Sequence, residues 1–445
     1  MSGAVDPASQ AWRLALAGVV LIGVVARAAV LAHGAGLPEG RLDDPDNYLP
    51  LARSLASGRG FAIDGRPTAY RPPLYPLILA PVAAALGDRP ATGVAALHLA
   101  LGAGCIWLTA SAARRQRLAP GRALVAAALV ACDPVLVSQS RVVMTETLAA
   151  FLAAGTLAAF SVPGRRGAAL GGVMFGLSTL CRPSAWPAAW LTAAARLLPG
   201  LDPDATPARE RLLQAALLLL VATATAAPWA LRNARVFGEP ILTTTHGGYT
   251  LALANNPVYY DEVVNGPPGA VWSGHNQWLW WDSVNRAGRG LAEPEADRRL
   301  RRETLQFIAA RPRDFARASL QRLGRFWGLA PAGVVYPKAL RFATALWTVP
   351  LWVALVLGLA RRPTWYWPGI VAPLCLIGLT LVHGVYWTDL RMRAAVVPAI
   401  ALIAAGAVWP CLPASLRGLT APRTGRKKSG NSVRFYCSNP GETLG

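Results

Sequence analysis

The stretch LALAGVVLIGVVARAAVLAH, residues 14–33, is apolar throughout except for Arg27 and the closing His33. A helix rises 1.5 Å per residue, so twenty residues span about 30 Å, which is the thickness of the hydrocarbon core of a bilayer. The stretch is too long for the apolar part of a signal peptide, and no convincing cleavage site follows it. We therefore expect an uncleaved first membrane helix.

Similar apolar stretches recur along most of the chain, separated by short basic clusters. Of the 445 residues, 53% are hydrophobic and only 15% are charged, whereas about 25% is usual for a soluble domain. The net charge of +21 would suggest a nucleic-acid partner in a soluble protein, but much of the excess lies between the apolar stretches. No RNP pattern, zinc finger or P-loop occurs, and the six cysteines lack metal spacing. The composition indicates a membrane protein with no nucleic-acid partner and no disulfide framework.

We predict an all-α polytopic membrane protein with about ten transmembrane helices. With the N-terminus in the cytoplasm, the inner connections and the C-terminal tail carry 17 Lys or Arg residues, and the short outer connections carry 4. Basic residues concentrate on the cytoplasmic side of membrane proteins, so we expect both termini in the cytoplasm. The predicted helices cover residues 12–33, 91–113, 121–138, 144–161, 167–181, 185–199, 211–231, 339–360, 365–385 and 394–413.

Two long segments are predicted to lie outside the membrane. The first, residues 34–90, contains three aspartates and the stretch PTAYRPPLYP. Its apolar part, residues 74–86, is too short to span a bilayer and rich in proline, so we expect an interfacial helix there. The second segment, residues 232–338, has amphipathic helical patterns in its later half, broken at Pro312.

This topology places nearly every unusual polar residue at the outer face. Ionisable groups at the membrane boundary of a bundle are candidates for function. A carboxylate there can act as a general base, and nearby arginines can bind a phosphate and stabilise it as a leaving group. These residues are Asp43, Asp44, Asp46, Arg71, Glu146, Arg182, Arg232, His383, Asp389, Arg391 and Arg393.

Several stretches occur in an order and spacing that match a known family. They read LDDPDNYLPLARSLASGRGFAIDGRPTAYRPPLYP, SRVVMTETL, LSTLCRPSAWP, PWALRNARVFGEPILTTTHGGYTLALANNP and DLRMRAAVVPAIALIAAG. With these motifs the chain resembles the bacterial polytopic glycosyltransferases of the GT-C superfamily, in the branch related to protein O-mannosyltransferases and lipid A aminoarabinose transferases. The resemblance covers residues 12–413, so we divide the chain into a GT-C-like membrane domain and a basic cytoplasmic tail, 414–445, expected to be disordered.

The resemblance implies an enzyme that takes a sugar from a polyprenyl-phosphate carrier and transfers it, with inversion, to an acceptor outside the membrane. The catalytic aspartate of the family lies four residues before a tyrosine, which selects Asp44 before Tyr48. The neighbouring Asp43 and Asp46 are alternatives, and Glu146 matches the acidic residue at the start of the fourth helix. The departing lipid phosphate is expected to bind arginines at the outer face. The candidates for substrate contact are Asp46, Tyr48, Arg71, Arg182, Arg232, His383, Arg391 and Arg393.

Some of these residues have a second interpretation. The three aspartates form either a solvated turn or, as in some relatives, a divalent-metal site, although no cofactor is required. His383 is more typical of a packed histidine. The tryptophans Trp272, Trp278, Trp280 and Trp281 suit an aromatic belt at the membrane interface better than a platform for sugars. We expect a turn-rich loop at Gly247, Gly248, Asn255 and Asn256, and a solvated basic face at Arg298 to Arg302.

Other functions remain open from the sequence. A transporter or flippase of lipid-linked glycans predicts polar groups at mid-membrane and broken helices in two related halves. A glycan polymerase or ligase would also use outer arginines but would not need the Asp–Tyr pattern after the first helix. A scaffold that has lost activity would not need that pattern either. The favoured location is the bacterial cytoplasmic membrane, with membrane lipids around the helices and the active site facing outward. The sugar and the acceptor, whether glycan, lipid or protein, are not identified.

Overall fold

The computed structural model describes residues 7–34, 43–87, 90–267, 269–272, 274–332 and 336–408. Within these ranges the chain is almost entirely helical, and its sheet is a two-stranded antiparallel hairpin of β1 (Ala62–Ile63) and β2 (Arg66–Pro67). The prediction of an all-α polytopic membrane protein is therefore confirmed. The tail from residue 414, which we expect to be disordered, lies outside the described residues.

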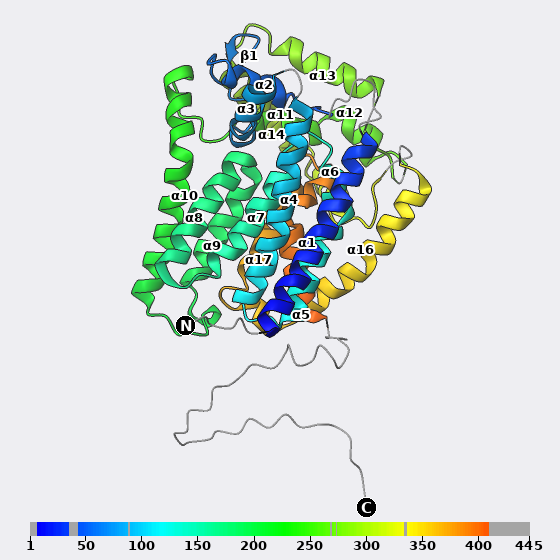
Figure 1. Ribbon diagram of the computed structural model, residues 1–445. Helices are drawn as coiled ribbons and strands as arrows, with labels where there is room; N and C mark the ends of the chain where they lie inside the picture. Colours follow the sequence, from blue (N-terminus) through cyan, green and yellow to red (C-terminus); the bar gives the residue numbers. More distant parts are fainter. Residues whose placement is uncertain are drawn as a thin grey trace, which may run out of the picture.

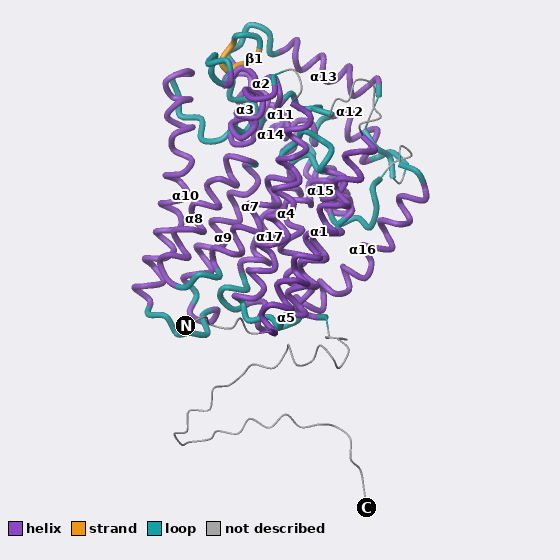
Figure 2. Tube along the Cα trace, viewed as in Figure 1, coloured by secondary structure: helices purple, strands orange, loops and turns teal. Residues whose placement is uncertain are grey.

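A bundle of helices standing side by side forms the body of the molecule (Figure 1). Both long connections, after the first and the seventh predicted membrane helix, lie at one end of this bundle. The opposite end carries the start of α1, dark blue in Figure 1, and the end of α18, orange in the same view. Figure 2 shows how much of the bundle is helical. The bundle contains α1 (Pro7–Gly34), α4 (Pro90–Arg115), α5 (Pro120–Cys132), α6 (Pro134–Gln139), α7 (Glu146–Phe160), α8 (Gly164–Cys181), α9 (Trp186–Leu197), α10 (Ala208–Phe237), α16 (Lys338–Leu359), α17 (Val371–Val385) and α18 (Val397–Ala407).

Five of the described segments are long and apolar enough to cross a bilayer: Ser9–His33, Pro90–Arg115, Ala208–Phe237, Lys338–Leu359 and Leu390–Ala407. The other predicted crossings correspond to α5, α7, α8, α9 and α17, which have 12 to 18 residues each. A helix of fewer than about 17 residues does not span the hydrocarbon core unaided. The number of crossings therefore stays a prediction.

Small residues let α8 and α10 pack closely. A Cβ atom on Gly172 would lie 2.7 Å from the carbonyl oxygen of Leu218, and one on Gly176 would lie 2.7 Å from that of Ala222. Both separations are shorter than real carbon–oxygen contacts, so both positions require glycine. Membrane helices have no hydrophobic drive to associate in lipid, and close approach at small residues gives them van der Waals contact instead.

The predicted helix 121–138 is two helices, α5 and α6, that meet at Asp133. Pro134 has no N–H and cannot continue α5. The Asp133 carboxylate accepts hydrogen bonds at 2.9 and 3.0 Å from two free N–H groups of α6. The buried guanidinium of Arg27 donates at 2.9 and 3.1 Å to two carbonyls at the end of α5. Protein groups therefore satisfy both helix ends at this break.

The first outer segment contains α2 (Tyr48–Ala56), the β1–β2 hairpin and α3 (Leu74–Leu86). A helix is present at 74–86 as α3, which packs against α2 and α4, and its position at the membrane interface stays a prediction. Residues 35–42, where this segment begins, lie outside the described part of the chain.

The second outer segment contains α11 (Gly247–Ala254), α12 (Pro257–Tyr259), the π-helical η4 (Tyr260–Val264), α13 (His275–Ala287), α14 (Glu293–Ala310) and α15 (Pro312–Phe326). The predicted break at Pro312 is confirmed because α14 ends at Ala310 and α15 begins at the proline. The expectation of a turn-rich loop at Gly247 and Gly248 is wrong, since both begin α11. A Cβ on Gly248 would lie 2.4 Å from a main-chain oxygen of α14, so this glycine serves close packing instead of a turn.

One glutamate joins the two outer segments. The Glu293 carboxylate accepts hydrogen bonds from Thr68 Oγ1 and from the N–H of Ala69, both at 2.7 Å, in the first segment. It also accepts one from Thr245 Oγ1 at 2.5 Å in the second. Charge-assisted bonds of this kind fix the relative position of two loops more firmly than neutral ones.

Candidate functional site

The aspartates after α1 have three different environments. The carbonyl of Asp43 accepts a hydrogen bond from Val143 N at 2.7 Å, which fixes the first outer segment against the start of α7. Its side chain is exposed. Asp44 and Asp46 are half-buried and face other groups of the outer layer.

The Asp44 carboxylate begins α2. Its oxygens accept hydrogen bonds from Tyr48 N at 2.9 Å and from Leu49 N at 2.8 Å. Asn47, the residue before the helix, has φ +59° in the left-handed region, which turns the chain so that both N–H groups face the carboxylate. Burial raises the pKa of Asp44 above its ordinary value, and the two N–H groups oppose that shift. In the described part of the chain, no guanidinium lies within ion-pair distance of Asp44.

Asp46 instead forms an ion pair with Arg71, with 2.9 Å between Oδ1 and Nη2. Arg71 also donates to the main-chain carbonyl of Asp46 at 3.2 Å and lies over the rings of Tyr48 and Tyr70, at 5.9 and 5.2 Å from their centroids. Its Nη1 is 3.4 Å from Nε2 of His246 at the start of α11. Arg71 therefore joins the first outer segment to the second.

Glu146, the first residue of α7, forms the centre of a second group. Its side chain is only 1% exposed, and one oxygen lies 3.0 Å from Arg182 and 3.9 Å from Arg391. Arg391 also pairs with Asp389 at 3.0 Å. Arg182 follows the last residue of α8, and Arg391 lies in the 3₁₀ segment η6 (Leu390–Val396) that precedes α18. Two arginines from different elements thus share one buried carboxylate.

Tyr48 lies between these groups. Burial raises the pKa of its hydroxyl well above the ordinary value, and the charges that act on it belong to Arg71, Asp46, Arg182 and Glu146. The two groups therefore form one charged cluster, with four carboxylates and three guanidinium groups. We define the charged cluster as Asp44, Asp46, Arg71, Glu146, Arg182, Asp389 and Arg391.

Two of the other predicted residues, Arg232 and Arg393, bind main-chain carbonyls of the protein itself. Arg232 donates at 2.8 Å to the carbonyls of Thr68 and Phe61 and so braces the β1–β2 hairpin. Arg393 donates at 2.8 Å to the carbonyl of Gly328. In the described structure neither arginine contacts the charged cluster, and their assignment to substrate binding stays a prediction.

His383 has the environment of a packed histidine. Its ring stacks on Phe326 with 5.1 Å between centroids, and its Nδ1 lies 3.2 Å from the carbonyl of Trp387. Among the described residues, no hydrogen bond or ion pair joins its ring to the charged cluster, and its assignment to substrate binding also stays a prediction.

The structure adds His246 to the predicted residues of the site, and it gives the outer-face residue Asp389 an ion-pair partner. Asp389 precedes Arg391 by two positions, and an ion pair between them could have been predicted from this spacing. His246 has no such signal, because its contact with Arg71 crosses from one outer segment to the other. Burial and the nearby Arg71 charge lower the pKa of His246 to about 3, so its imidazole is neutral at physiological pH.

The three aspartates are not arranged as ligands for one metal ion. Asp43 is exposed, Asp44 binds main-chain N–H groups and Asp46 pairs with Arg71. Over the described residues, no three His, Cys, Asp or Glu side chains come together in a way that would hold a metal. We derive no step through a metal.

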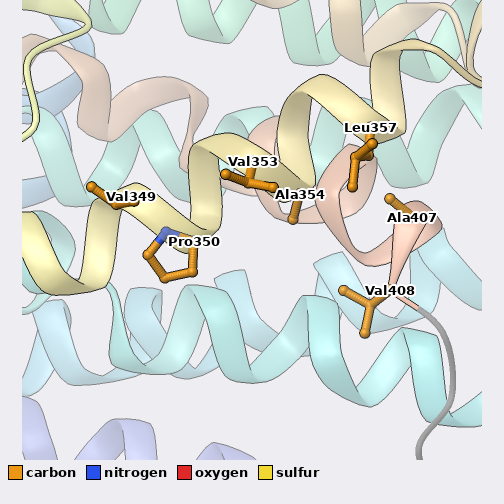
Figure 3. Close-up of a pocket in the computed structure, with 7 residues that line it drawn as sticks. All are labelled: Val349, Pro350, Val353, Ala354, Leu357, Ala407 and Val408. Carbon is orange, nitrogen blue, oxygen red and sulfur yellow. The ribbon is translucent and has the colours of Figure 1, made fainter.

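An apolar cavity of about 560 Å³ lies apart from the charged cluster, between α16 and the end of α18 (Figure 3). It is lined by Val349, Pro350, Val353, Ala354, Leu357, Ala407 and Val408. None of these side chains carries a polar group, so the cavity has no chemistry of its own.

The sequence matches no family model and no curated protein, but its fold resembles solved structures. Archaeal oligosaccharyltransferase AglB from Archaeoglobus fulgidus, in complex with an inhibitory peptide and a dolichol-phosphate, matches with a TM-score of 0.54 and 16% identity, over 90% of this chain and 50% of that one. The same oligosaccharyltransferase tethered with an acceptor peptide matches with a TM-score of 0.55 and 14% identity, over 89% and 49%. ArnT from Cupriavidus metallidurans, bound to undecaprenyl phosphate, has a TM-score of 0.40 and 14% identity, over 87% and 77%.

The likeness to AglB defines the class of fold. The chain is a polytopic helical membrane protein whose charged cluster lies at the loop-bearing end of the bundle. Over about nine-tenths of its length it shares the fold of an archaeal oligosaccharyltransferase, in agreement with the fold that the resemblance of its motifs predicts. It spans about half the length of the oligosaccharyltransferases that it matches.

Proposed function

We propose that the chain is a membrane glycosyltransferase, which moves a sugar from a polyprenyl-phosphate-linked donor to an acceptor at the outer face of the cytoplasmic membrane, with inversion at the anomeric carbon. The observation that carries this proposal is that one carboxylate of the charged cluster, Asp44, pairs with no arginine that the structure describes, while three guanidinium groups lie in the same cluster. Inverting transfer needs both a base for the acceptor and cations for the leaving group.

Asp44 is the general base in this proposal. As the acceptor oxygen attacks the anomeric carbon, its proton passes to the Asp44 carboxylate. The bond between that carbon and the phosphate oxygen breaks, and its electron pair leaves with the lipid phosphate. Burial supports this role, because a carboxylate with a raised pKa is a stronger base than one in water. Asp46 is less suited because its charge is compensated by Arg71.

Arg391 and Arg182 are the proposed contacts of the lipid phosphate. Both lie beside the carboxylate of Glu146, and Arg391 also pairs with Asp389, but the side chain of Arg391 is 31% exposed and can reach a ligand. Guanidinium groups bind phosphate through paired N–H donors, and stabilise the charge that develops on it as the sugar leaves. The dolichol-phosphate in one AglB structure supports a lipid-linked phosphate as the donor carrier of this fold.

The proposal is tested with purified protein in nanodiscs and radiolabelled polyprenyl-phosphate hexoses and pentoses. Asp44→Asn is expected to lower the rate of sugar release at least roughly 100-fold, the contribution of a positioned base, while the carrier still binds. Asp43→Asn is the matched control and is expected to keep activity, since its side chain is exposed.

The pH profile gives a second readout. The base acts only when it is deprotonated, so the rate should rise as pH increases through the raised pKa of Asp44 and then level off. Asp44→Asn should remove this acid limb. An inactive Asp43→Asn beside an active Asp44→Asn would assign the base to the other aspartate. Failure of every carrier to bind would reject the lipid-phosphate donor and favour a transporter of lipid-linked glycans.

A further inference from the structure

A continuous row of aromatic rings borders the charged cluster. Neighbouring rings along it have centroids 4.3 to 6.4 Å apart. The rings come from both outer segments and from the connection between α17 and η6. We define the aromatic row, in order of contact, as Tyr70, His246, Tyr249, Trp280, Trp272 and Trp387.

Both ends of the aromatic row adjoin the charged cluster. At one end, the Tyr70 ring lies 5.2 Å beneath the guanidinium of Arg71. At the other end, Trp387 precedes Asp389 by two residues. The main-chain N–H of Trp387 donates at 3.2 Å to the carbonyl of Thr250 in α11. The two ends of the row therefore lie near two members of the charged cluster, Arg71 and Asp389.

The position of α13 disfavours an aromatic belt at the membrane interface. This helix carries Trp280 and lies above α2 and α12, at the extreme of the outer layer away from the bundle (Figure 1). Trp278 and Trp281 on the same helix are 56% and 45% exposed there. Belt tryptophans sit at the level of the lipid headgroups, close to the ends of the membrane helices.

The rings of the row are tilted by 31° to 77° to their neighbours, and part of their surface stays accessible together with polar groups. Tyr70, Tyr249 and Trp280 are half-buried, and over the described residues neither tyrosine hydroxyl nor the Trp280 N–H has a hydrogen-bond partner. Trp272 is buried and packs against Tyr259, which anchors the row from behind. The rings carry no formal charge, since the His246 imidazole is neutral. Such a surface fits a sugar ring, which has an apolar C–H face and an edge of hydroxyl groups.

We infer that the aromatic row is the binding site of the acceptor, and that the acceptor is a carbohydrate. This inference rests on the proposed transferase function and names the substrate class that it leaves open. A sugar bound to Tyr249 and Trp280 lies along a row that leads through His246 to Arg71, on the side of the charged cluster that also holds Asp46. A lipid acceptor would not require the polar edges of these rings.

The test measures binding of fluorescently labelled tetrasaccharides of glucose, mannose, galactose and N-acetylglucosamine to the full chain in nanodiscs, by fluorescence polarisation. At least one of them should bind the parent, and Trp280→Ala and Tyr249→Ala should each weaken it by about tenfold, or about 1.4 kcal/mol. Trp280→Phe, which keeps an aromatic ring, should retain most of the affinity. Trp107→Ala is the matched control, because Trp107 is 53% exposed on α4, outside the row.

Binding of a polyprenyl phosphate is measured on the same variants and should be unchanged, which also shows that they are folded. If no tetrasaccharide binds the parent, or if one binds Trp280→Ala as well as it binds the parent, the inference is wrong. Binding of a labelled unglycosylated peptide that Trp280→Ala abolishes would assign the row to a protein acceptor and overturn it. Tetrasaccharide binding without carrier binding would instead reject the proposed donor and leave the carbohydrate site standing.

Discussion

Environment distinguishes three aspartates within four positions of the chain. The sequence presents Asp43, Asp44 and Asp46 as near equals, because each is an acidic residue in a loop after the first helix. In the structure one is exposed, one caps α2 and one is neutralised by an arginine. Only the second combines partial burial with a carboxylate that forms no ion pair with a guanidinium, which is why we propose it as the general base.

The ion pair between Glu146 and Arg182 can be tested through its contribution to stability. Replacing it by Gln leaves the charge of Arg182 buried without compensation, so we expect the free energy of unfolding to fall by about 3 kcal/mol. Glu303→Gln is the matched control, because it removes one partner of a pair whose side chains are 51% and 52% exposed, and should cost less than about 0.5 kcal/mol. Thermal unfolding in nanodiscs measures both.

A double variant separates the ion pair from other roles of Glu146. Glu146→Gln with Arg182→Met removes both charges, so part of the lost stability should return if the two side chains act as a pair. If the double variant is as unstable as the sum of the single ones, the pair contributes nothing, and Glu146 stabilises the protein in another way.

At the scale of elements, the break between α5 and α6 sets the path of the chain toward the charged cluster. α6 leads to residues 140–145, and Val143 in that stretch binds Asp43 before α7 begins with Glu146. A broken helix is also what a transporter would show. Here, however, Arg27 and Asp133 satisfy both helix ends with protein groups, so the break serves positioning.

Asp133 gives a prediction for this break. Asp133→Ala removes the acceptor of two N–H groups at the start of α6 and should lower the free energy of unfolding by about 1–2 kcal/mol. Asp133→Asn keeps an oxygen acceptor and should cost less. Thermal unfolding ranks the parent, the Asn variant and the Ala variant in that order. If both variants lose the same stability, the negative charge of Asp133 stabilises the protein, through its attraction to Arg27 and Arg393, and the hydrogen bonds to α6 do not.

The sequence predicts the membrane elements better than the outer ones. Apolar length identifies α1, α4, α10 and α16 directly, because a bilayer imposes one dimension on every crossing. It misses the division at Asp133, since the hydrophobic pattern continues through it. It also misses that Gly247 and Gly248 begin a helix, because only contact with α14 reveals why a side chain is excluded there.

For the candidate site, too, the sequence predicts some features and not others. Motif order points to Asp44, Arg71, Glu146, Arg182 and Arg391, all of which the structure brings into the charged cluster. It does not separate these from Arg232 and Arg393, whose guanidinium groups bind main-chain carbonyls. A sequence identifies an arginine but not its partner, and the partner decides whether its charge is available to a ligand.

For the molecule as a whole, the sidedness of the bundle decides which substrates reach the charged cluster. Both long connections lie at one end, and the basic connections counted above belong to the other (Figure 1). If basic residues stay in the cytoplasm, the charged cluster faces outward. An outward site has no access to cytoplasmic nucleotide sugars, and its donor must cross the membrane attached to a lipid.

This orientation is tested with single cysteines at the two ends. Ser57→Cys places a thiol at the end of α2, in the outer layer that also holds the charged cluster, and Arg115→Cys places one at the far end of α4; both positions are exposed. The native cysteines Cys105, Cys181 and Cys375 are buried and are kept. Serine replaces the exposed Cys132, as well as Cys411 and Cys437, which lie outside the described residues.

A membrane-impermeant maleimide should label Ser57→Cys in intact cells, and Arg115→Cys only after the membrane is opened. The reverse pattern would put the charged cluster in the cytoplasm, where soluble nucleotide sugars can reach it, and the reason to require a lipid-linked donor would be lost. Labelling of both in intact cells would mean that the chain inserts in two orientations, and that its basic residues are too evenly divided to fix one.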